Sequence, residues 1–299
     1  MRFLSRIALF VLTNVAVMVL LGFVLRITGL DMALQRDGLN AGALLVVAAI
    51  IGFTGSLISL ALSKPIAKWT TGARVIDAPR SEAEAWLVQT VRQLAAQSQI
   101  GTPEVAVYPS GDLNAFATGA RRDHALVAVS EGLLHRMSRP EIEAVLAHEV
   151  SHVASGDMVT MTLLQGVVNT FVFFLSRVAG YLVDAALSRG DDRRRGRGIG
   201  YYLTVVVAEI TLGLLASLIV MAFSRHREYR ADAGAARLVG PANMIAALRR
   251  LQGVHEPTAL PQTMSAFGIR GAPRGGFLRL LMSHPPLDER IAALEQLPR

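Results

Sequence analysis

The chain is built around the stretch Leu146-Ala147-His148-Glu149-Val150-Ser151-His152. An H-E-x-x-H run on a helix places two imidazoles one turn apart on the same face, which is half of a zinc site. A catalytic zinc has three protein ligands and leaves a fourth position to water, so His148 and His152 need one more ligand from elsewhere in the chain. Glu149 can face that position, take a proton from the metal-activated water and pass it to a leaving amine.

The residues before this motif predict that it lies on a helix. Ser138 is followed by Pro140 in the first turn and by Glu141, whose side chain can return to the cap. Apolar residues between positions 144 and 150 continue a helical pattern. A chance H-E-x-x-H in this chain has a probability on the order of 1%. We therefore predict a metal site here.

The composition indicates an integral membrane protein. Of the 299 residues, 52% are hydrophobic and only 18% are charged, which is too apolar for a soluble globular protein. The chain has no cysteine, so a metal must be held by histidine and carboxylate side chains. The formal net charge of +7 comes mostly from arginines beside apolar stretches, which suits a lipid bilayer with anionic headgroups better than nucleic acid. We expect no nucleic-acid partner.

Four apolar runs, at residues 7–25, 41–62, 158–182 and 201–223, are long enough to be transmembrane helices. A cleaved signal peptide is the alternative for the first run, but no small-x-small site follows it directly, and a retained helical hairpin fits better. The last two runs contain Gln165, Asn169, Arg177 and Glu209, which must face protein, water or a cavity rather than lipid.

The distribution of basic residues predicts the orientation in the membrane. Arg2 and Arg6 precede the first run, and Lys64, Lys68 and Arg74 follow the second. The positive-inside bias then predicts that the N-terminus and the segment after residue 63, which contains the H-E-x-x-H motif, lie in the cytoplasm. An arginine-rich loop at 188–198 conflicts with this bias if the third and fourth runs both cross the membrane, which we nevertheless favour on length.

The remaining segments predict an α+β fold, mostly helical with a small sheet. Ser81 and Glu84 resemble a second capping box, opening an amphipathic helix that ends near Gly101. Residues 104–108 and 125–129 are predicted as strands, and residues 114–118 as a third strand or a loop. A strand edge beside a zinc site can bind an extended peptide through main-chain hydrogen bonds.

Residues 224–236 offer candidates for the missing ligand. Glu228 and Asp232 lie one turn apart on one helix face, so one carboxylate can bind zinc while the other orients an imidazole. The alternative is a charged helix next to the membrane whose carboxylates pair with nearby arginines.

The whole chain resembles the HtpX-type membrane zinc endopeptidases, which are related more distantly to the type 1 CAAX prenyl proteases. The resemblance rests on the paired N-terminal runs, the zinc motif, the two later runs and three further stretches. These stretches are Asn114-Ala115-Phe116-Ala117, Ser224-Arg225-His226-Arg227-Glu228-Tyr229-Arg230-Ala231-Asp232 and Ser283-His284-Pro285-Pro286-Leu287-Asp288-Glu289-Arg290.

The resemblance implies a zincin-like domain that binds one zinc ion per chain and hydrolyses protein or peptide substrates. His148, His152 and Glu228 would be the zinc ligands and Glu149 the general base. Asp232 would orient a ligand histidine, His284 would assist the developing oxyanion, and residues Asn114, Ala115, Phe116 and Ala117 would line the substrate edge. The resemblance also implies a multi-pass protein of a bacterial-type inner membrane, with its catalytic domain facing the cytoplasm, that acts in quality control of membrane proteins under stress.

Taken together, these features divide the chain into four segments. Residues 1–63 and 158–223 are expected to be transmembrane hairpins, and residues 64–157 and 224–299 the two parts of the zincin domain. One alternative is an intramembrane zinc protease, but the approach to the motif from Ser138 is too polar for a transmembrane helix. The other is a membrane scaffold or transporter that holds zinc without proteolysis, with Glu209, Gln165 and Asn169 forming a polar pathway.

Overall fold

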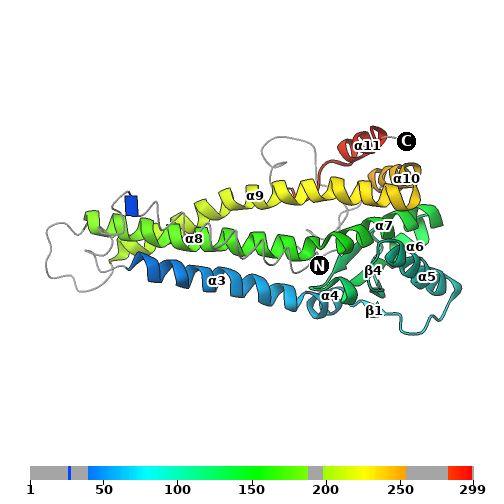
Figure 1. Ribbon diagram of the computed structural model, residues 1–299, viewed down its shortest axis with the longest axis horizontal. Coiled ribbons are helices and arrows are strands. Elements are labelled where there is room, and N and C mark those ends of the chain that lie inside the picture. Colours follow the sequence, from blue (N-terminus) through cyan, green and yellow to red (C-terminus); the bar gives the residue numbers. More distant parts are fainter. Residues whose placement is uncertain (1–25, 28–39, 188–197, 254–281, 298–299) are drawn as a thin grey trace. The chain divides into compact units, whose positions relative to one another are not determined.

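The computed structural model describes residues 26–27, 40–187, 198–253 and 282–297 (Figure 1). The predicted run at 7–25 and nearly all of the arginine-rich loop lie outside the described residues. The chain divides into two compact units, residues 1–58 with 162–219 and residues 59–161 with 220–299. We call the first the membrane unit and the second the motif unit, because the second contains the H-E-x-x-H helix.

Three helices in the described part of the chain are long and apolar enough to cross a membrane. They are α3 (Ala41–Ala61), α8 (Asp157–Leu187) and α9 (Ile199–Val239). They confirm the apolar runs predicted at 41–62, 158–182 and 201–223. The fourth run and the charged stretch after it form one continuous helix of 41 residues, not two elements. In the membrane unit many large side chains on these helices are exposed, as expected for surfaces that contact lipid.

Polar side chains inside the membrane unit pair with one another. Arg177 of α8 forms an ion pair with Glu209 of α9, and its guanidinium lies over the Phe173 ring. Gln165 donates a hydrogen bond of 2.8 Å to Asn169. Pairing of this kind lowers the cost of polar groups at membrane depth. As predicted, these polar side chains contact protein groups, which belong to α8 and α9 themselves.

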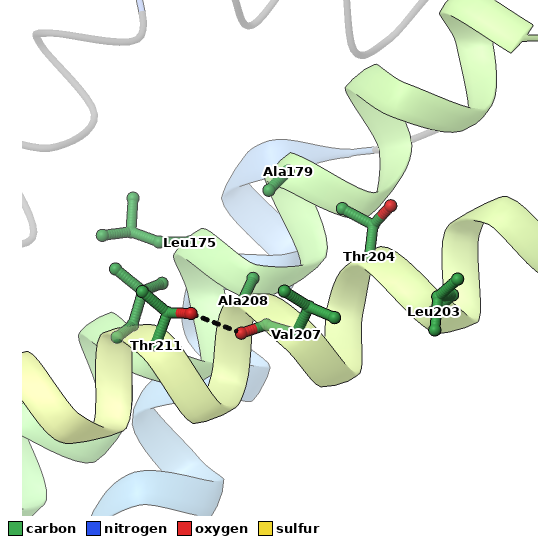
Figure 2. Close-up of a pocket in the computed structure, with 8 residues that line it drawn as sticks. Leu175, Ala179, Leu203, Thr204, Val207, Ala208 and Thr211 are labelled. Atoms are coloured by element: carbon green, nitrogen blue, oxygen red, sulfur yellow. Dashed lines mark hydrogen bonds between the residues drawn. The ribbon is translucent and has the colours of Figure 1, made fainter.

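A groove of about 620 Å³ runs along α8 and α9 in the membrane unit (Figure 2). Its lining consists of leucine, alanine, valine and threonine side chains, namely Leu175, Ala179, Leu203, Thr204, Val207, Ala208, Thr211 and Leu212. None of them titrates or binds metals readily. The groove therefore offers apolar surface but no group for hydrolysis.

The motif unit contains a mixed sheet of four strands in the order β1-β2-β4-β3. The strands are β1 (Arg74–Val75), β2 (Glu104–Tyr108), β3 (Ala115–Thr118) and β4 (Leu126–Ser130). β2 and β4 are parallel, while β1 and β3 run antiparallel to their neighbours. The predicted strand at 104–108 is confirmed, the one at 125–129 begins and ends one residue later, and the segment at 114–118 forms a strand. β1 was not predicted.

Alternating residues of the sheet form two cores. Val105, Val107, Val127 and Val129 face a large core with α5 (Glu82–Gln97) and α7 (Arg139–Ser155). Residues of the opposite face pack around Ala67 of α4 (Ser63–Thr71). A strand directs successive side chains to opposite faces, so both faces of this sheet must be covered by helices.

Further helices complete the motif unit, and α7 is capped by residues at its two ends. α6 (Glu131–Arg136) follows β4, a 3₁₀ turn spans Arg122–His124, and α10 (Pro241–Gln252) packs against α7 and α11 (Leu287–Glu295). As predicted, Ser138 caps α7 and its backbone N–H donates to the Glu141 carboxylate at 2.8 Å. The helix ends at Gly156, whose φ of 65° favours glycine.

Candidate metal centre

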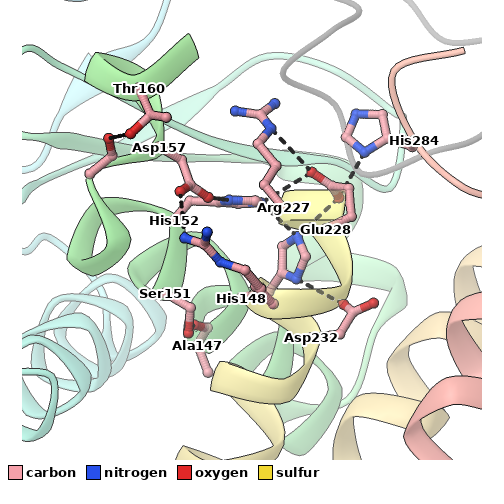
Figure 3. A network of polar contacts seen from close by, with 12 residues as sticks. Ala147, His148, Ser151, His152, Asp157, Thr160, Arg227, Glu228, Asp232 and His284 are labelled. Carbon is pink, nitrogen blue, oxygen red and sulfur yellow. Dashed lines mark hydrogen bonds and ion pairs between the residues drawn. The ribbon is translucent and has the colours of Figure 1, made fainter. Parts of the chain in front are cut away.

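The side chains of His148, His152 and Glu228 converge on one point in the motif unit (Figure 3). The two Nε2 atoms are 3.1 Å apart. One carboxylate oxygen of Glu228 lies 3.4 Å from Nε2 of His148, and the other lies 3.3 Å from Nε2 of His152. All three side chains are buried. The helix α7 supplies the histidine pair and α9 supplies the carboxylate.

These distances fit a tetrahedral zinc ion. Zinc bonds of about 2.0–2.1 Å to nitrogen and oxygen place neighbouring ligand atoms about 3.3 Å apart. In addition, neither carboxylate oxygen of the fully buried Glu228 has a hydrogen-bond partner of regular geometry among the described residues, and His284 and Arg290 approach it only as ion-pair contacts, at 2.8 and 3.5 Å. A buried carboxylate left in this state is costly unless a cation compensates it. The three residues therefore fit one zinc ion and leave a position for water or substrate.

A close approach between α9 and α7 brings Glu228 to the histidines. Gly234 lies in α9 directly against Ser151 of α7, and a Cβ atom at Gly234 would come within 2.6 Å of the Ser151 hydroxyl. A side chain at position 234 would therefore require either the Ser151 side chain or the two helices to shift. The Ser151 hydroxyl donates a hydrogen bond of 2.7 Å to the Ala147 carbonyl in the same helix. Gly234 was not among the residues predicted from the sequence.

Each histidine of the pair also contacts a carboxylate through its other ring nitrogen. Asp232 lies 3.0 Å from Nδ1 of His148, and Asp157 lies 2.7 Å from Nδ1 of His152. Such contacts fix the tautomer that directs Nε2 to the metal. The structure thus places Asp232 beside a ligand histidine, as the family resemblance implied. Asp157 was not predicted, although an acidic residue only five positions after His152, just past the end of α7, could have suggested it.

Arg290 also contacts the site and was not predicted from the sequence as a site residue. It is fully buried, and its guanidinium donates two hydrogen bonds to Asp232, at 2.8 Å from Nε and 2.6 Å from a terminal nitrogen. Its other terminal nitrogen lies 3.5 Å from Glu228. A bidentate arginine of this kind neutralises a buried carboxylate and fixes its orientation. The signal in the sequence was its place in the stretch that begins with Ser283 and His284.

Burial and charge shift the acid–base properties of the site. Burial raises the pKa of Glu149, which is 4% exposed, while the neighbouring His148 and His152 oppose that change. A raised pKa suits a group that both takes and returns a proton near neutral pH. Burial alone would lower the pKa of His152, but the Glu228 charge and the contact with Asp157 outweigh it and raise this pKa to about 9.

The remaining predicted site residues lie in the same unit. His284 is buried, and its Nδ1 atom lies 2.8 Å from Glu228 (Figure 3). Ala115, Phe116 and Ala117 belong to β3, which is one of the two end strands of the described sheet and packs against α7. Asn114 immediately precedes β3, is buried, and its backbone N–H donates to the Ser130 hydroxyl at 3.1 Å.

A buried carboxylate beside a His-His-Glu metal site defines a class of protein, the zinc-dependent metallopeptidases, and the apolar helices make this one a membrane protein. The family model for Peptidase family M48 matches residues 81–297. The chain belongs to this family, among its HtpX-type proteases.

Curated relatives match over nearly the whole chain. "Protease HtpX homolog" from Janthinobacterium sp. (strain Marseille) is 59% identical over 98% of this chain and 100% of its own length. The homolog from Bordetella pertussis is 57% identical over 98% of each chain. The solved structure of S. mikatae Ste24p has a similar fold, with a TM-score of 0.59 and 20% identity over 91% of this chain and 66% of that one. These comparisons agree with the resemblance drawn from the motifs.

Proposed function

We propose that this membrane zinc metalloprotease hydrolyses peptide bonds of membrane or misfolded proteins at the cytoplasmic face of a bacterial inner membrane, in quality control under stress. The observation that carries the proposal is the convergence of His148, His152 and Glu228 on one ion-sized position. Glu149 directly follows His148 in α7. Because the same chain contains helices that can cross a membrane, we propose that its substrates are embedded in the bilayer or lie close to it.

Bound zinc would polarise the scissile carbonyl and lower the pKa of a water molecule, so that the water could lose a proton and act as a nucleophile near neutral pH. His148, His152 and Glu228 hold the ion in this proposal, while Asp232 and Asp157 keep the two imidazoles in their ligand tautomer. Glu149 accepts the proton of the attacking water and returns it to the leaving amine. Its buried position supports this role, because a raised pKa helps the carboxyl to give the proton back.

Two further elements are proposed to bind the substrate. Nε2 of His284 is buried and has no hydrogen-bond partner among the described residues, so it is available to donate to the developing oxyanion. The chain at Asn114 to Ala117 is proposed to hold the substrate in extended form, because β3 pairs with β4 alone among the described strands. A peptide can add to such an edge by main-chain hydrogen bonds.

The proposed general base is tested by Glu149→Gln. We expect proteolysis to fall by about 100-fold or more while zinc remains bound, because the carboxylate transfers protons without holding the ion. Casein cleavage and the zinc content of the purified protein measure the two effects. Glu143→Gln, on the same helix, is the matched control and should keep activity. Activity of Glu149→Gln within about tenfold of the parent would remove Glu149 from the role of base.

The proposed orientation is tested with single cysteines, because the natural chain contains none. A cysteine replaces the exposed Gln93 of α5 in one variant and Gly190 in another. In intact cells a membrane-impermeant thiol reagent should label position 190 and leave position 93 unlabelled if the motif unit is cytoplasmic and α8 and α9 both cross. Labelling at position 93 would reverse the orientation, and protection of both would favour a hairpin that does not cross.

A further inference from the structure

The helix α4 has an outward face made only of apolar side chains. Leu62, Ile66 and Trp69 follow one another at helical spacing and are 47%, 43% and 82% exposed. Pro65, on the same side, is also exposed. Among the described positions of the motif unit, the only other large apolar residue with an exposed side chain is Phe223, at the end of the apolar stretch of α9. An apolar face of this kind on an otherwise polar unit marks a contact surface.

The opposite face of α4 is bound to the sheet. Ala67 is fully buried in the core formed by the sheet face that includes Ala106, Phe116 and Ala128. Lys64 and Lys68 both donate to the carboxylate of Glu104 at the start of β2, at 2.7 and 2.6 Å. α4 is thus fixed on the sheet through one face, and its apolar face points away from the motif unit.

The preceding helix indicates what covers that face. α3 has 21 residues, ends at Ala61 and is separated from α4 by Leu62 alone. A helix of 21 residues is about 31 Å long, close to the thickness of about 30 Å of the hydrocarbon core. If α3 crosses the bilayer, the chain leaves the hydrocarbon near Ala61, and α4 begins among the lipid headgroups. Tryptophan is enriched at this depth, where its ring is apolar and its N–H remains hydrated.

We propose that α4 is an interfacial helix that lies in the headgroup region of the bilayer and attaches the adjacent sheet to the membrane surface. Leu62, Ile66 and Trp69 insert at the boundary with the acyl chains, as the apolar side of an amphipathic interfacial helix does. Because α4 covers one face of the sheet and α5 and α7 cover the other, the two faces differ in their access to lipid. The inference does not depend on the zinc chemistry.

The two tryptophans of the chain provide the test, since they lie on opposite sides of the sheet. Trp69 belongs to α4, whereas Trp86 belongs to α5, packs against the large core and has the Arg139 guanidinium 5.4 Å from its ring centre. The full-length Trp86→Phe protein, in vesicles of phosphatidylcholine and phosphatidylglycerol, reports on Trp69 alone. The Trp69→Phe protein is the matched control and reports on Trp86.

We expect lipids brominated near the top of their acyl chains to quench the Trp69 emission, with weaker quenching by lipids brominated deeper. The Trp86 emission should be unaffected by either lipid. If Trp86→Phe folds poorly, the parent spectrum minus that of Trp69→Phe gives the same quantity. Trp69 quenched by aqueous iodide but not by brominated lipid would overturn the proposal. Protection of Trp69 from both quenchers would also overturn the proposal, because it would mean that another segment or a second copy of the chain covers α4. Equal quenching of Trp69 and Trp86 by lipid would overturn it as well.

Discussion

The two halves of α9 place their side chains in opposite ways. In the first half large apolar side chains are exposed, for example Leu203 at 63% and Ile210 at 61%. In the second half charged side chains are buried, including Arg227, Glu228 and Asp232. One continuous helix thus has a part suited to lipid and a part suited to a metal site. The difference shows that burial in this chain follows the surroundings of a segment and not the polarity of its residues.

The largest effect should come from Glu228→Gln, in the buried half. Loss of the charged ligand leaves a pair of histidines, which is a poor zinc site, so we expect loss of metal and of proteolysis. The loss of affinity should exceed the roughly 10- to 100-fold that outer partners of a metal ligand contribute. Zinc content after dialysis and casein cleavage measure it.

Glu209→Gln, in the exposed half, is the control for this comparison. It disrupts the ion pair with Arg177 but should leave the zinc content unchanged. Parental zinc affinity in Glu228→Gln would require another third ligand, with Asp232 the first candidate. Equal loss of zinc in both variants would remove the distinction between the two halves of α9.

A smaller effect, on stability, is expected for Arg290→Met. Removing one member of a buried ion pair costs about 3–5 kcal/mol, because the carboxylate of Asp232 is then left buried without its partner. Arg249→Met removes an exposed ion pair between Arg249 of α10 and Glu295 of α11, the helix that also contains Arg290. This change should cost no more than about 1 kcal/mol. Thermal unfolding of the purified proteins compares the two. Similar values for both variants would mean that burial does not determine the strength of these contacts.

Asp157→Asn should act chiefly on the affinity for the metal. Asp157 contacts His152 and also accepts a hydrogen bond of 3.3 Å from Arg230 of α9. We expect zinc affinity to fall by about 10- to 100-fold, as is typical when the partner of a ligand histidine is lost. Competition with a fluorescent chelator measures it, and Glu131→Gln, at an exposed position, is the control. Unchanged affinity would mean that Asp157 does not orient His152.

The effect that is smallest per step is the dependence of zinc affinity on pH, which accumulates over each pH unit. Zinc binds the neutral imidazole, whereas His152 without metal has a pKa raised to about 9 by Glu228 and Asp157 despite its burial. Below this pH a proton competes with zinc at His152, and this proton alone should lower the affinity by about tenfold for each pH unit between pH 8 and 6. The same competition assay measures the slope, which should be less steep in Asp157→Asn. An affinity independent of pH would contradict the raised pKa.

The sequence was sufficient for features that depend on local periodicity. The spacing of His148 and His152 fixes two imidazoles on one face of any helix, and Ser138 with Glu141 marks where that helix begins. Apolar runs long enough for a bilayer predicted α3, α8 and the first half of α9 for the same reason. In each case the residues that carry the signal are neighbours in the chain.

The tertiary structure alone decided how distant segments meet. Glu228 and Asp232 are equivalent in periodicity, and the structure distinguishes them by placing Glu228 at the Nε2 atoms and Asp232 at Nδ1 of His148. Arg290, 142 positions after His148, reaches the site through α11, and Gly234 permits the close approach of α9. Such contacts depend on how helices pack across the core, and the spacing of residues within a single segment carries no information about that packing.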